Sequence, residues 1–535
     1  MKKFKKFFFV IYPLFVAVYP ILSLFQTNIE YIPFSDSIWS IVTAILVTGG
    51  LFVGFCLFLR DWEKINLILA MAWILFFSYG HVRNLIKNWT IWENLHSTAI
   101  ILMPLWILFI SFWVWAVLAK FKSHIQWNRF MALLGFVFCL LPAYQITKYY
   151  VRPNVDPGFL LTEVTEFKFK WTRDGAPPNI YYIILDGYGR EDILLDIYQH
   201  DNSDFITALE NQGFYVADHS NSNYIQTIFS LNSALNMEYL DYLQNAPGTD
   251  LNKRKFLALK TKNSSVQKIL AANGYQIVII DSGLLNTDGV DKVISINDDF
   301  TTEGSTKRPR SANAFELLLL ESSALQGFLD LIILQIGLAN EQEIFSSTTF
   351  KAHRERVLAS FSALENFAGT PGSHFVFVHI VSPHPPFVFT ADGNEVDITA
   401  AFSHLEGDLD PDKRATYIAG YRAQLTYINQ KTLAAIETIL QNSETPPIII
   451  VQGDHGPGAY LQWDSAAKSN LPERLSILNA YYFPENNYQS LYPDISPINT
   501  FRVLFNTHFG GNFNLLEDRS YFSTWGSFDF LDVTP

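Results

Sequence analysis

Residues 1–150 contain long stretches of apolar side chains, whereas the rest of the chain alternates between short apolar runs and amphipathic stretches. A helix that crosses a membrane needs about 20 mostly apolar residues. Several stretches approach this length, and the third is the shortest. We therefore expect about five membrane-spanning helices, at Phe7–Phe25, Ile38–Leu59, Ile65–Tyr79, Thr98–Leu118 and Phe130–Ile146.

The first of these stretches follows a basic start, which is also how a cleaved signal peptide begins. It is not followed by a convincing small-residue cleavage site, and further apolar stretches come directly after it. We therefore expect this segment to be retained as a helix of the mature protein.

Basic residues predict the orientation of these helices, because loops that face the cytoplasm are enriched in lysine and arginine. With the N-terminus inside, the outer loops hold only Arg83 and Lys87. The inner segments then hold Lys2, Lys3, Lys5, Lys6, Arg60, Lys64, Lys120, Lys122 and Arg129. Five spans place residue 147 onward outside, whereas six would leave it in the cytoplasm. We expect a multi-pass protein of a bacterial cytoplasmic (inner) membrane, with its large domain on the periplasmic or extracellular side.

From residue 179 onward, short apolar runs rich in β-branched and aromatic residues predict strands buried on both faces of a sheet. These runs are Asn179–Asp186, Tyr275–Asp281, His374–Ile380, Pro447–Val451 and Ile477–Phe483. Helical stretches near Ser203–Asn211, Ser265–Asn273 and Pro411–Gln441 separate them. Strands that alternate with helices predict an α/β domain whose mostly parallel sheet is sandwiched by helices.

The pattern therefore divides the chain into a transmembrane anchor at 1–150, a linker at 151–178 and an extracytoplasmic domain at 179–535. The anchor either only tethers that domain or also shapes a site for a lipid substrate. Residues 312–340 are unusually apolar for the second part, but Glu316, Glu321 and Asp330 make them a poor membrane span. We expect helices there that pack on the domain or on the anchor, and a membrane-dipping element is the alternative.

Charge and cysteine content exclude some classes of partner and of functional site. Residues 1–150 hold 12 of the 38 basic and 5 of the 51 acidic residues, so the remainder carries a net charge of about −20. Such an acidic domain argues against nucleic acid as a partner, because nucleic-acid binding needs a basic surface. Both cysteines, Cys56 and Cys139, lie in the apolar stretches. The second part therefore has no disulfide, cysteine-bound metal or cysteine nucleophile.

Polar residues follow the predicted strands at their carboxyl ends, where active sites of parallel sheets form. Asp186 closes the first strand, and Asp454 and His455 follow the fourth in a GDHG sequence. These side chains are ligands of hard or borderline divalent cations. Because adjacent residues of a strand point apart, Asp454 and His455 need a turn to face one ion, and we expect Gly453 and Gly456 to provide it.

Thr227 lies between the first and second strands, in QTIFSLNS. A hydroxyl bound to a divalent cation has a lowered pKa and becomes a nucleophile without a separate base. Ser230 and Ser233 lie nearby and remain alternatives. His384 follows the third strand, where it would contact a phosphoryl oxygen or protonate a leaving alkoxide. His379, inside that strand, is expected to be structural, while His219 and His508 stay unassigned.

On these residues the chain resembles the alkaline phosphatase/sulfatase superfamily. Within it, the chain looks most like the membrane-anchored phosphoglycerol and phosphoethanolamine transferases, the lipoteichoic acid synthase-like enzymes. The resemblance covers the five-helix architecture and residues from about 179 to 510. It implies that Asp186, Thr227, Asp454 and His455 are metal ligands, that Thr227 is also the nucleophile, and that His384 binds the substrate phosphate. It also implies double displacement through a phosphothreonine.

The chain departs from this family in three ways. Lipoteichoic acid synthases tend to have Glu where Asp186 stands. Phosphoethanolamine transferases usually have disulfides in the soluble domain, which has no cysteine here. Sulfatases need a Cys or Ser in a C/S-x-P-x-R context, and Thr227 lies in none, which argues against sulfate-ester hydrolysis. A two-metal phosphatase would need a further Asp/His/His set, and the sequence offers only scattered candidates for one. A single divalent ion (Mn²⁺, Mg²⁺ or Zn²⁺) is therefore favoured.

The sequence thus predicts a metal-dependent transferase that moves phosphoglycerol or phosphoethanolamine from a membrane phospholipid to a cell-envelope glycan or lipid-linked acceptor. The alternative enzyme is a membrane-anchored phosphodiesterase, phosphatase or other sulfatase-fold hydrolase whose acceptor is water. A non-catalytic surface protein that has kept the fold is the third possibility, and it predicts that no metal is bound.

Overall fold

The computed structural model describes residues 2–29, 34–87, 95–120, 124–151, 171, 176–246, 250–281, 292–295, 314–336, 341–396 and 406–535. Most of the predicted linker, residues 151–178, lies outside this set. The chain forms two compact units, one of residues 1–153 with 308–347 and one of residues 154–307 with 348–535.

The first unit contains the predicted anchor helices. They are α1 (Lys2–Thr27), α2 (Phe34–Phe58), α3 (Trp62–Lys87), α4 (Leu95–Ala119) and α5 (His124–Val151). In the described residues, α2 to α5 are long and apolar enough to cross a membrane, while the described apolar part of α1, Ile11–Thr27, is shorter. Apolar side chains on the outer faces of α2 and α4 are exposed, as a lipid environment requires.

The third helix extends beyond the range that the sequence predicted. α3 begins at Trp62 and ends at Lys87, whereas the apolar pattern ended at Tyr79. The added turns contain Arg83, whose Nε donates a hydrogen bond to Asp330 Oδ2 at 3.1 Å. Both side chains are at most 5% exposed. A cation that is paired inside the unit does not end the helix, although it interrupts the apolar pattern.

Asp330 belongs to the apolar segment 312–340, for which the sequence allowed either helices packed on the domain or the anchor, or an element that dips into the membrane. This segment forms α12 (Ala314–Glu321) and α13 (Ala324–Ile336), and both belong to the first unit. Phe315 of α12 joins a buried cluster with Phe25 and Phe77, and Ala324 of α13 lies in another with Tyr79 and Met103. The segment therefore packs on the anchor helices.

The second unit is an α/β domain built on a seven-stranded sheet in the order β2-β7-β6-β1-β5-β3-β4. The strands are β1 (Ile180–Leu185), β2 (Tyr215–Val216), β3 (Gln276–Asp281), β4 (Lys292–Ser295), β5 (His374–Ile380), β6 (Ile448–Gly453) and β7 (Asn479–Tyr482). Pairing among β6, β1, β5, β3 and β4 is parallel, and β7 is antiparallel to both of its neighbours. The predicted strands are all present, and the short strands β2 and β4 were not predicted.

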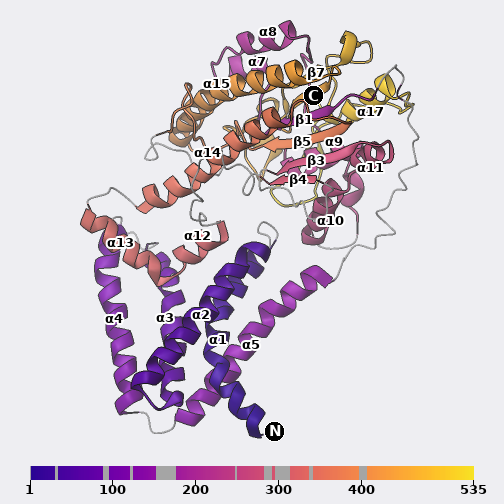
Figure 1. Ribbon diagram of the computed structural model, residues 1–535. Helices are drawn as coiled ribbons and strands as arrows, with labels where there is room; N and C mark the ends of the chain where they lie inside the picture. The colour runs from indigo at the N-terminus through magenta and orange to yellow at the C-terminus, as the bar shows by residue number, and fades with distance from the viewer. Residues whose placement is uncertain are drawn as a thin grey trace. The chain divides into compact units, whose positions relative to one another are not determined.

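Helices cover both faces of this sheet (Figure 1). One face packs against α8 (Ser203–Asn211), α14 (Glu341–Phe367) and α15 (Pro411–Asn442). The other packs against α9 (Thr227–Asn236), α11 (Ser265–Ala272) and α17 (Pro497–His508). All six residues of β1 are buried, because alternate side chains enter the two apolar layers. The fold class expected from the sequence is confirmed.

The remaining elements of the second unit are short or lie at its edges. They are α7 (Glu191–Asp196), α10 (Asp250–Lys262), α16 (Leu471–Leu475), β8 (Tyr521–Phe522), β9 (Leu531–Asp532) and the 3-10 turns at Asp241–Leu243, Ala466–Lys468 and Pro484–Asn486.

Candidate active site

The sheet itself brings the predicted ligands together. β1 and β6 are parallel neighbours, and Leu185 is paired with Gly453. The residues that follow these two positions, Asp186 and Asp454, therefore leave the same edge of the sheet side by side. Asp186 is 3% exposed and Asp454 1%, so neither carboxylate is solvated by bulk water.

His455 follows directly in the GDHG turn and is also 1% exposed. Its Nδ1 lies 2.9 Å from the Gly456 carbonyl oxygen. A carbonyl only accepts, so Nδ1 carries the proton and Nε2 presents a lone pair. Nε2 lies 3.5 Å from Asp186 Oδ1 and 3.4 Å from Asp454 Oδ2.

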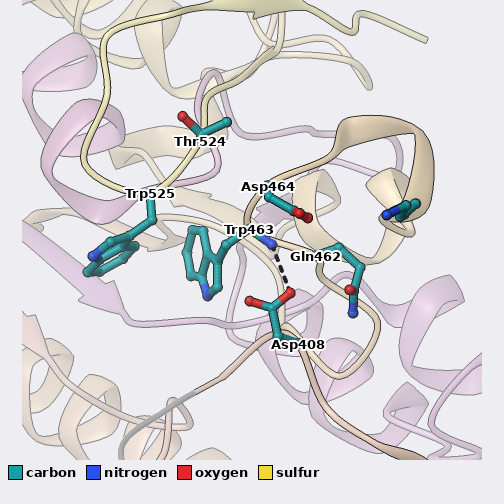
Figure 2. A pocket seen from close by; sticks show the side chains of 7 residues that line it. Asp408, Gln462, Trp463, Asp464, Thr524 and Trp525 are labelled. Carbon is teal, nitrogen blue, oxygen red and sulfur yellow. Dashed lines mark hydrogen bonds between the residues drawn. The ribbon is translucent and has the colours of Figure 1, made fainter.

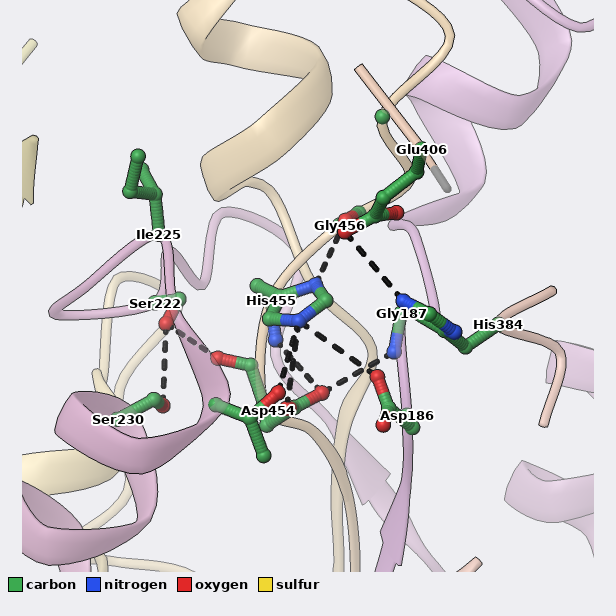
Figure 3. Close-up of polar contacts among 12 residues, drawn as sticks. Asp186, Gly187, Ser222, Ile225, Ser230, His384, Glu406, Asp454, His455 and Gly456 are labelled. Atoms are coloured by element: carbon green, nitrogen blue, oxygen red, sulfur yellow. Dashed lines mark hydrogen bonds and ion pairs between the residues drawn. The ribbon is translucent and has the colours of Figure 1, made fainter. Parts of the chain in front are cut away.

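These three atoms fit a divalent cation. Two ligands that each lie about 2.1 Å from a tetrahedral ion are about 3.4 Å apart, which is close to the distances found here. Asp186 Oδ1 and Asp454 Oδ2 are both buried without a hydrogen-bond partner. Leaving two buried carboxylate oxygens unsatisfied is costly unless a cation lies between them. The other oxygen of Asp454 accepts hydrogen bonds from the Gly187 and His455 amides, which orient the carboxylate (Figure 3).

The glycines of the turn are required for a different reason than the sequence suggested. The left-handed backbone angles are found at Gly187 but not at Gly453 or Gly456. A Cβ at Gly453 would lie 2.6 Å from the Tyr188 carbonyl oxygen, and one at Gly456 would overlap the Glu473 carbonyl. Close approach of neighbouring backbone, not a positive φ, therefore selects glycine at both positions.

Thr227 is the first residue of α9, and its Oγ1 lies 3.1 Å from His455 Nε2. A bond from Ser222 Oγ to the Asp454 carbonyl ties the segment before α9 to the ligand turn. The two alternative hydroxyls are engaged elsewhere. Ser230 Oγ lies 3.2 Å from Ser222 Oγ, and Ser233 Oγ donates to the Glu238 carbonyl. Of Thr227, Ser230 and Ser233, it is therefore the partly exposed Thr227 whose hydroxyl contacts a side chain of the predicted ligand set.

His384 lies at the open side of the site, with its side chain 19% exposed. Its Nδ1 donates to the Pro385 carbonyl at 2.6 Å, and its Nε2 lies 3.4 Å from Glu406 Oε1. Burial would lower the pKa of His384, but the negative charges of Asp186 and Glu406 raise it to about 10. Burial likewise raises the pKa of Asp186, yet the nearby histidines hold it below its ordinary value.

The structure adds two charged residues that the sequence reading missed, Glu406 and Arg474. Arg474 Nη2 lies 2.7 Å from Glu406 Oε1 and 3.3 Å from His455 Nε2. Both side chains are almost fully buried, at 1% and 6% exposure. Glu406 lies outside the strands and Arg474 on the short helix α16, so neither directly follows a strand and no local pattern in the sequence marks them.

The three other histidines that the sequence analysis considered, His379, His219 and His508, lie in different environments. His379, expected to be structural, is buried on β5 with its Nε2 3.2 Å from Asp186 Oδ2, so it contacts a ligand carboxylate. His219 is exposed on the surface. His508 is buried on α17, with its ring centroid 4.7 Å from that of Phe483, in an apolar layer of the sheet.

No family of known sequences matches this chain, and no curated protein matches it either. Solved structures do resemble it. The zinc complex of the periplasmic domain of EptC from Escherichia coli has 12% identity, covers 69% of this chain and 96% of its own, and has a TM-score of 0.41. The integral membrane lipooligosaccharide phosphoethanolamine transferase A from Neisseria meningitidis has 12% identity, covers 93% and 95%, and has a TM-score of 0.37.

A third similar structure is the lipoteichoic acid synthase LtaP from Listeria monocytogenes, with 13% identity, coverage of 68% of this chain and 82% of its own, and a TM-score of 0.37. The similar structures thus include both kinds of enzyme that the sequence resembles. Because the identities and TM-scores are low, the function proposed below rests on this chain's own residues.

Proposed function

We propose that this chain is a metal-dependent transferase. It would move a phospho-alcohol head group, phosphoglycerol or phosphoethanolamine, from a membrane phospholipid to a cell-envelope glycan or glycolipid. The observation that carries the proposal is the hydroxyl of Thr227, which lies 3.1 Å from His455 Nε2. The same nitrogen lies within 3.5 Å of two buried carboxylate oxygens that have no hydrogen-bond partner. A nucleophile next to a cation-shaped set of ligands is suited to attack on phosphorus.

Asp186, Asp454 and His455 would hold the ion, which we propose is Mn²⁺, Mg²⁺ or Zn²⁺. A bound divalent ion lowers the pKa of a hydroxyl beside it and neutralises charge on phosphoryl oxygens. The position of Thr227 at the start of α9 adds to this, because the N-terminus of a helix favours an anionic group. Arg474, adjacent to His455, places a second positive charge near the same point.

In the first step Thr227 Oγ1, having lost its proton to solvent, would attack as the alkoxide and bond to phosphorus while the bond from phosphorus to the diacylglycerol oxygen breaks. The negative charges of Asp186 and Glu406 raise the pKa of His384 and so favour its protonated form, which is suited to protonate the departing alkoxide. In the second step an acceptor hydroxyl would attack the phosphothreonine and His384 would take its proton. The bond from phosphorus to Thr227 Oγ1 would break, and Thr227 would leave as the alkoxide that began the first step. Glu406, 3.4 Å from His384, would orient the imidazole in both steps.

The anchor supports a lipid donor, because its apolar helices would hold the site at a membrane. We propose a bacterial cytoplasmic membrane location, with five spans and the second unit on the periplasmic or extracellular side. The distribution of basic residues supports this orientation. A phosphodiesterase that uses water as acceptor would employ the same residues for its first step, and the choice of acceptor distinguishes the two enzymes.

The test uses the full chain in liposomes that contain labelled phosphatidylglycerol or phosphatidylethanolamine. We expect a mass increase on the peptide that contains Thr227, and the added mass names the transferred group. Release of diacylglycerol that continues only when a glycan acceptor is present supports transfer, whereas steady release without one supports hydrolysis. Thr227→Ala should lose the adduct, while Ser233→Ala, a nearby hydroxyl bonded elsewhere, should keep it. An adduct that persists in Thr227→Ala would refute the assignment.

A further inference from the structure

A hollow of about 420 Å³ is formed in part by the loop that follows the ligand turn. It is lined by two tryptophans, Trp463 and Trp525, and by the polar residues Asp408, Gln462, Asp464, Lys468 and Thr524. Asp408, Gln462 and Asp464 lie on the side of Trp463 that faces away from Trp525 (Figure 2). None of these residues takes part in the chemistry proposed above. Their combination of aromatic rings with polar groups of both charges indicates a binding surface.

The two indoles are fixed in place although they face solvent. Their ring centroids are 4.7 Å apart with an angle of 67° between the planes. The guanidinium of Arg254 lies 5.8 Å from the Trp525 ring, and that of Arg474 lies 5.4 Å from the Trp463 ring. Cations over the rings hold both indoles in one orientation. Trp525 is nevertheless 59% exposed, which is unusual for so large an apolar side chain.

The polar groups around these rings are available for a ligand. The side chains of Asp464 and Lys468 are both exposed, and among the described residues they form no hydrogen bond or ion pair. Asp408 Oδ1 accepts a bond from the Trp463 amide at 3.3 Å, which leaves its second oxygen open. The hollow therefore offers acceptors on two carboxylates and donors on Lys468. The Gln462 side chain adds an acceptor oxygen and one further N–H, because its other N–H donates to the Leu461 carbonyl at 3.2 Å.

The hollow is joined to the candidate active site through short contacts. Trp463 Nε1 donates to the Glu406 carbonyl at 2.8 Å, and the Glu406 carboxylate contacts both His384 and Arg474. Gly407 lies so close to Trp463 that a Cβ there would come within 2.6 Å of the indole nitrogen. A ligand on the tryptophans would thus lie next to the residues that border the site.

We infer that this hollow binds a sugar ring of the acceptor, an inference that rests on the proposed transferase function. The C–H groups on one face of a sugar ring carry a slight positive charge and pack on the negative face of an indole. Its hydroxyl groups both donate and accept, which matches the mixed carboxylate, amide and ammonium groups at this rim. Ethanolamine could pair with the two carboxylates, but it has no ring face to cover an indole and offers no acceptor to the Lys468 ammonium beyond its single hydroxyl, so it is the competing ligand in the test.

The test measures binding of glucose, N-acetylglucosamine, maltose and chitobiose to the full chain in detergent, by saturation-transfer NMR. We expect transfer to the ring C–H protons of at least one of these sugars. Trp525→Ala should weaken that binding about tenfold. Leu515→Ala removes another exposed apolar side chain, 46% exposed, and should bind the sugar as the native chain does. No binding of any of the four sugars, equal binding by Trp525→Ala, or transfer to ethanolamine instead would overturn the inference.

The two proposals can fail separately. Trp525→Ala should still form the adduct on Thr227, which also shows that the variant folds, but should need a higher acceptor concentration for turnover. Thr227→Ala should lose the adduct and still bind the sugar. An adduct without sugar binding would overturn the sugar site alone. Sugar binding without an adduct on Thr227 in the native chain would refute the transferase and, with it, the role of the sugar as an acceptor.

Discussion

The imidazole of His455 contacts most of the other groups of the candidate site. Its Nε2 lies within 3.5 Å of both ligand carboxylates and 3.1 Å from the Thr227 hydroxyl. One bond to the Gly456 carbonyl sets its tautomer. Such a bond to the far ring nitrogen orients a metal-binding histidine and raises the basicity of the nitrogen that binds.

Replacing Asp454 by Asn should lower divalent-metal affinity by at least about tenfold, because the neutral amide cannot balance the charge of the ion. Metal bound per chain, measured by mass spectrometry after dialysis of the full protein against a trace of Mn²⁺ or Zn²⁺, checks this. Asp412→Asn, an exposed position on α15, is the matched control. Equal metal content in the two variants would remove Asp454 from the ligand set.

Glu406 and Arg474 form a buried ion pair at 2.7 Å, so each needs the other. Arg474→Met should lower the free energy of unfolding by about 3–5 kcal/mol, since it leaves the Glu406 carboxylate buried without its main partner. Adding Glu406→Gln to Arg474→Met should recover part of that loss. Chemical denaturation of the full chain in detergent measures both variants. Additive losses in the double variant would show that the pair is not coupled.

At the scale of elements, α12 and α13 dock on the anchor helices through close backbone contacts. A Cβ at Gly80 of α3 would lie 2.6 Å from Ser322 Cα, and one at Gly327 of α13 would overlap the Tyr79 ring. The buried pair Arg83–Asp330 joins the same two helices. Small residues at such contacts let helices approach closely, which is how helices associate in a membrane protein.

Gly327→Leu should therefore push α13 away from α3, because the new side chain has no free space. Hydrogen exchange of the amides in Ala324–Ile336 should become faster than in the native chain. Gly54→Leu is the matched control, because a Cβ at Gly54 has no atom within 4 Å and its exchange pattern should stay native. Native exchange in Gly327→Leu would contradict this docking.

At the scale of the whole molecule, the odd number of spans that we propose places the second unit outside the cytoplasm. Cysteine labelling tests this, since Cys56 and Cys139 are the only native cysteines and both can be replaced by Ala. In intact cells, Lys413→Cys on α15 should react with a membrane-impermeant maleimide. Arg60→Cys, in a predicted inner loop, should react only after the membrane is permeabilised. Labelling of Lys413→Cys only after permeabilisation would place the unit in the cytoplasm.

The strands, and the meeting of Asp186 with Asp454 and His455 at one edge of the sheet, could be predicted from the sequence, because both follow from local patterns. A buried parallel strand is a continuous apolar run, as in β1, and a functional side chain comes directly after it, as Asp186 does. The parallel sheet then brings such strand ends together without further information.

The features that only the tertiary structure revealed are residues in loops and contacts between segments that are distant in the sequence. Glu406, Arg474 and the Trp463–Trp525 pair meet through irregular backbone, whose conformation no periodic pattern specifies. The packing of α12 and α13 on the anchor likewise involves a contact between Asp330 and Arg83, which lies 247 residues earlier in the chain. An apolar run indicates that a segment is buried. The segment against which it packs is determined by complementary shape and charge, which exist only once the chain has folded.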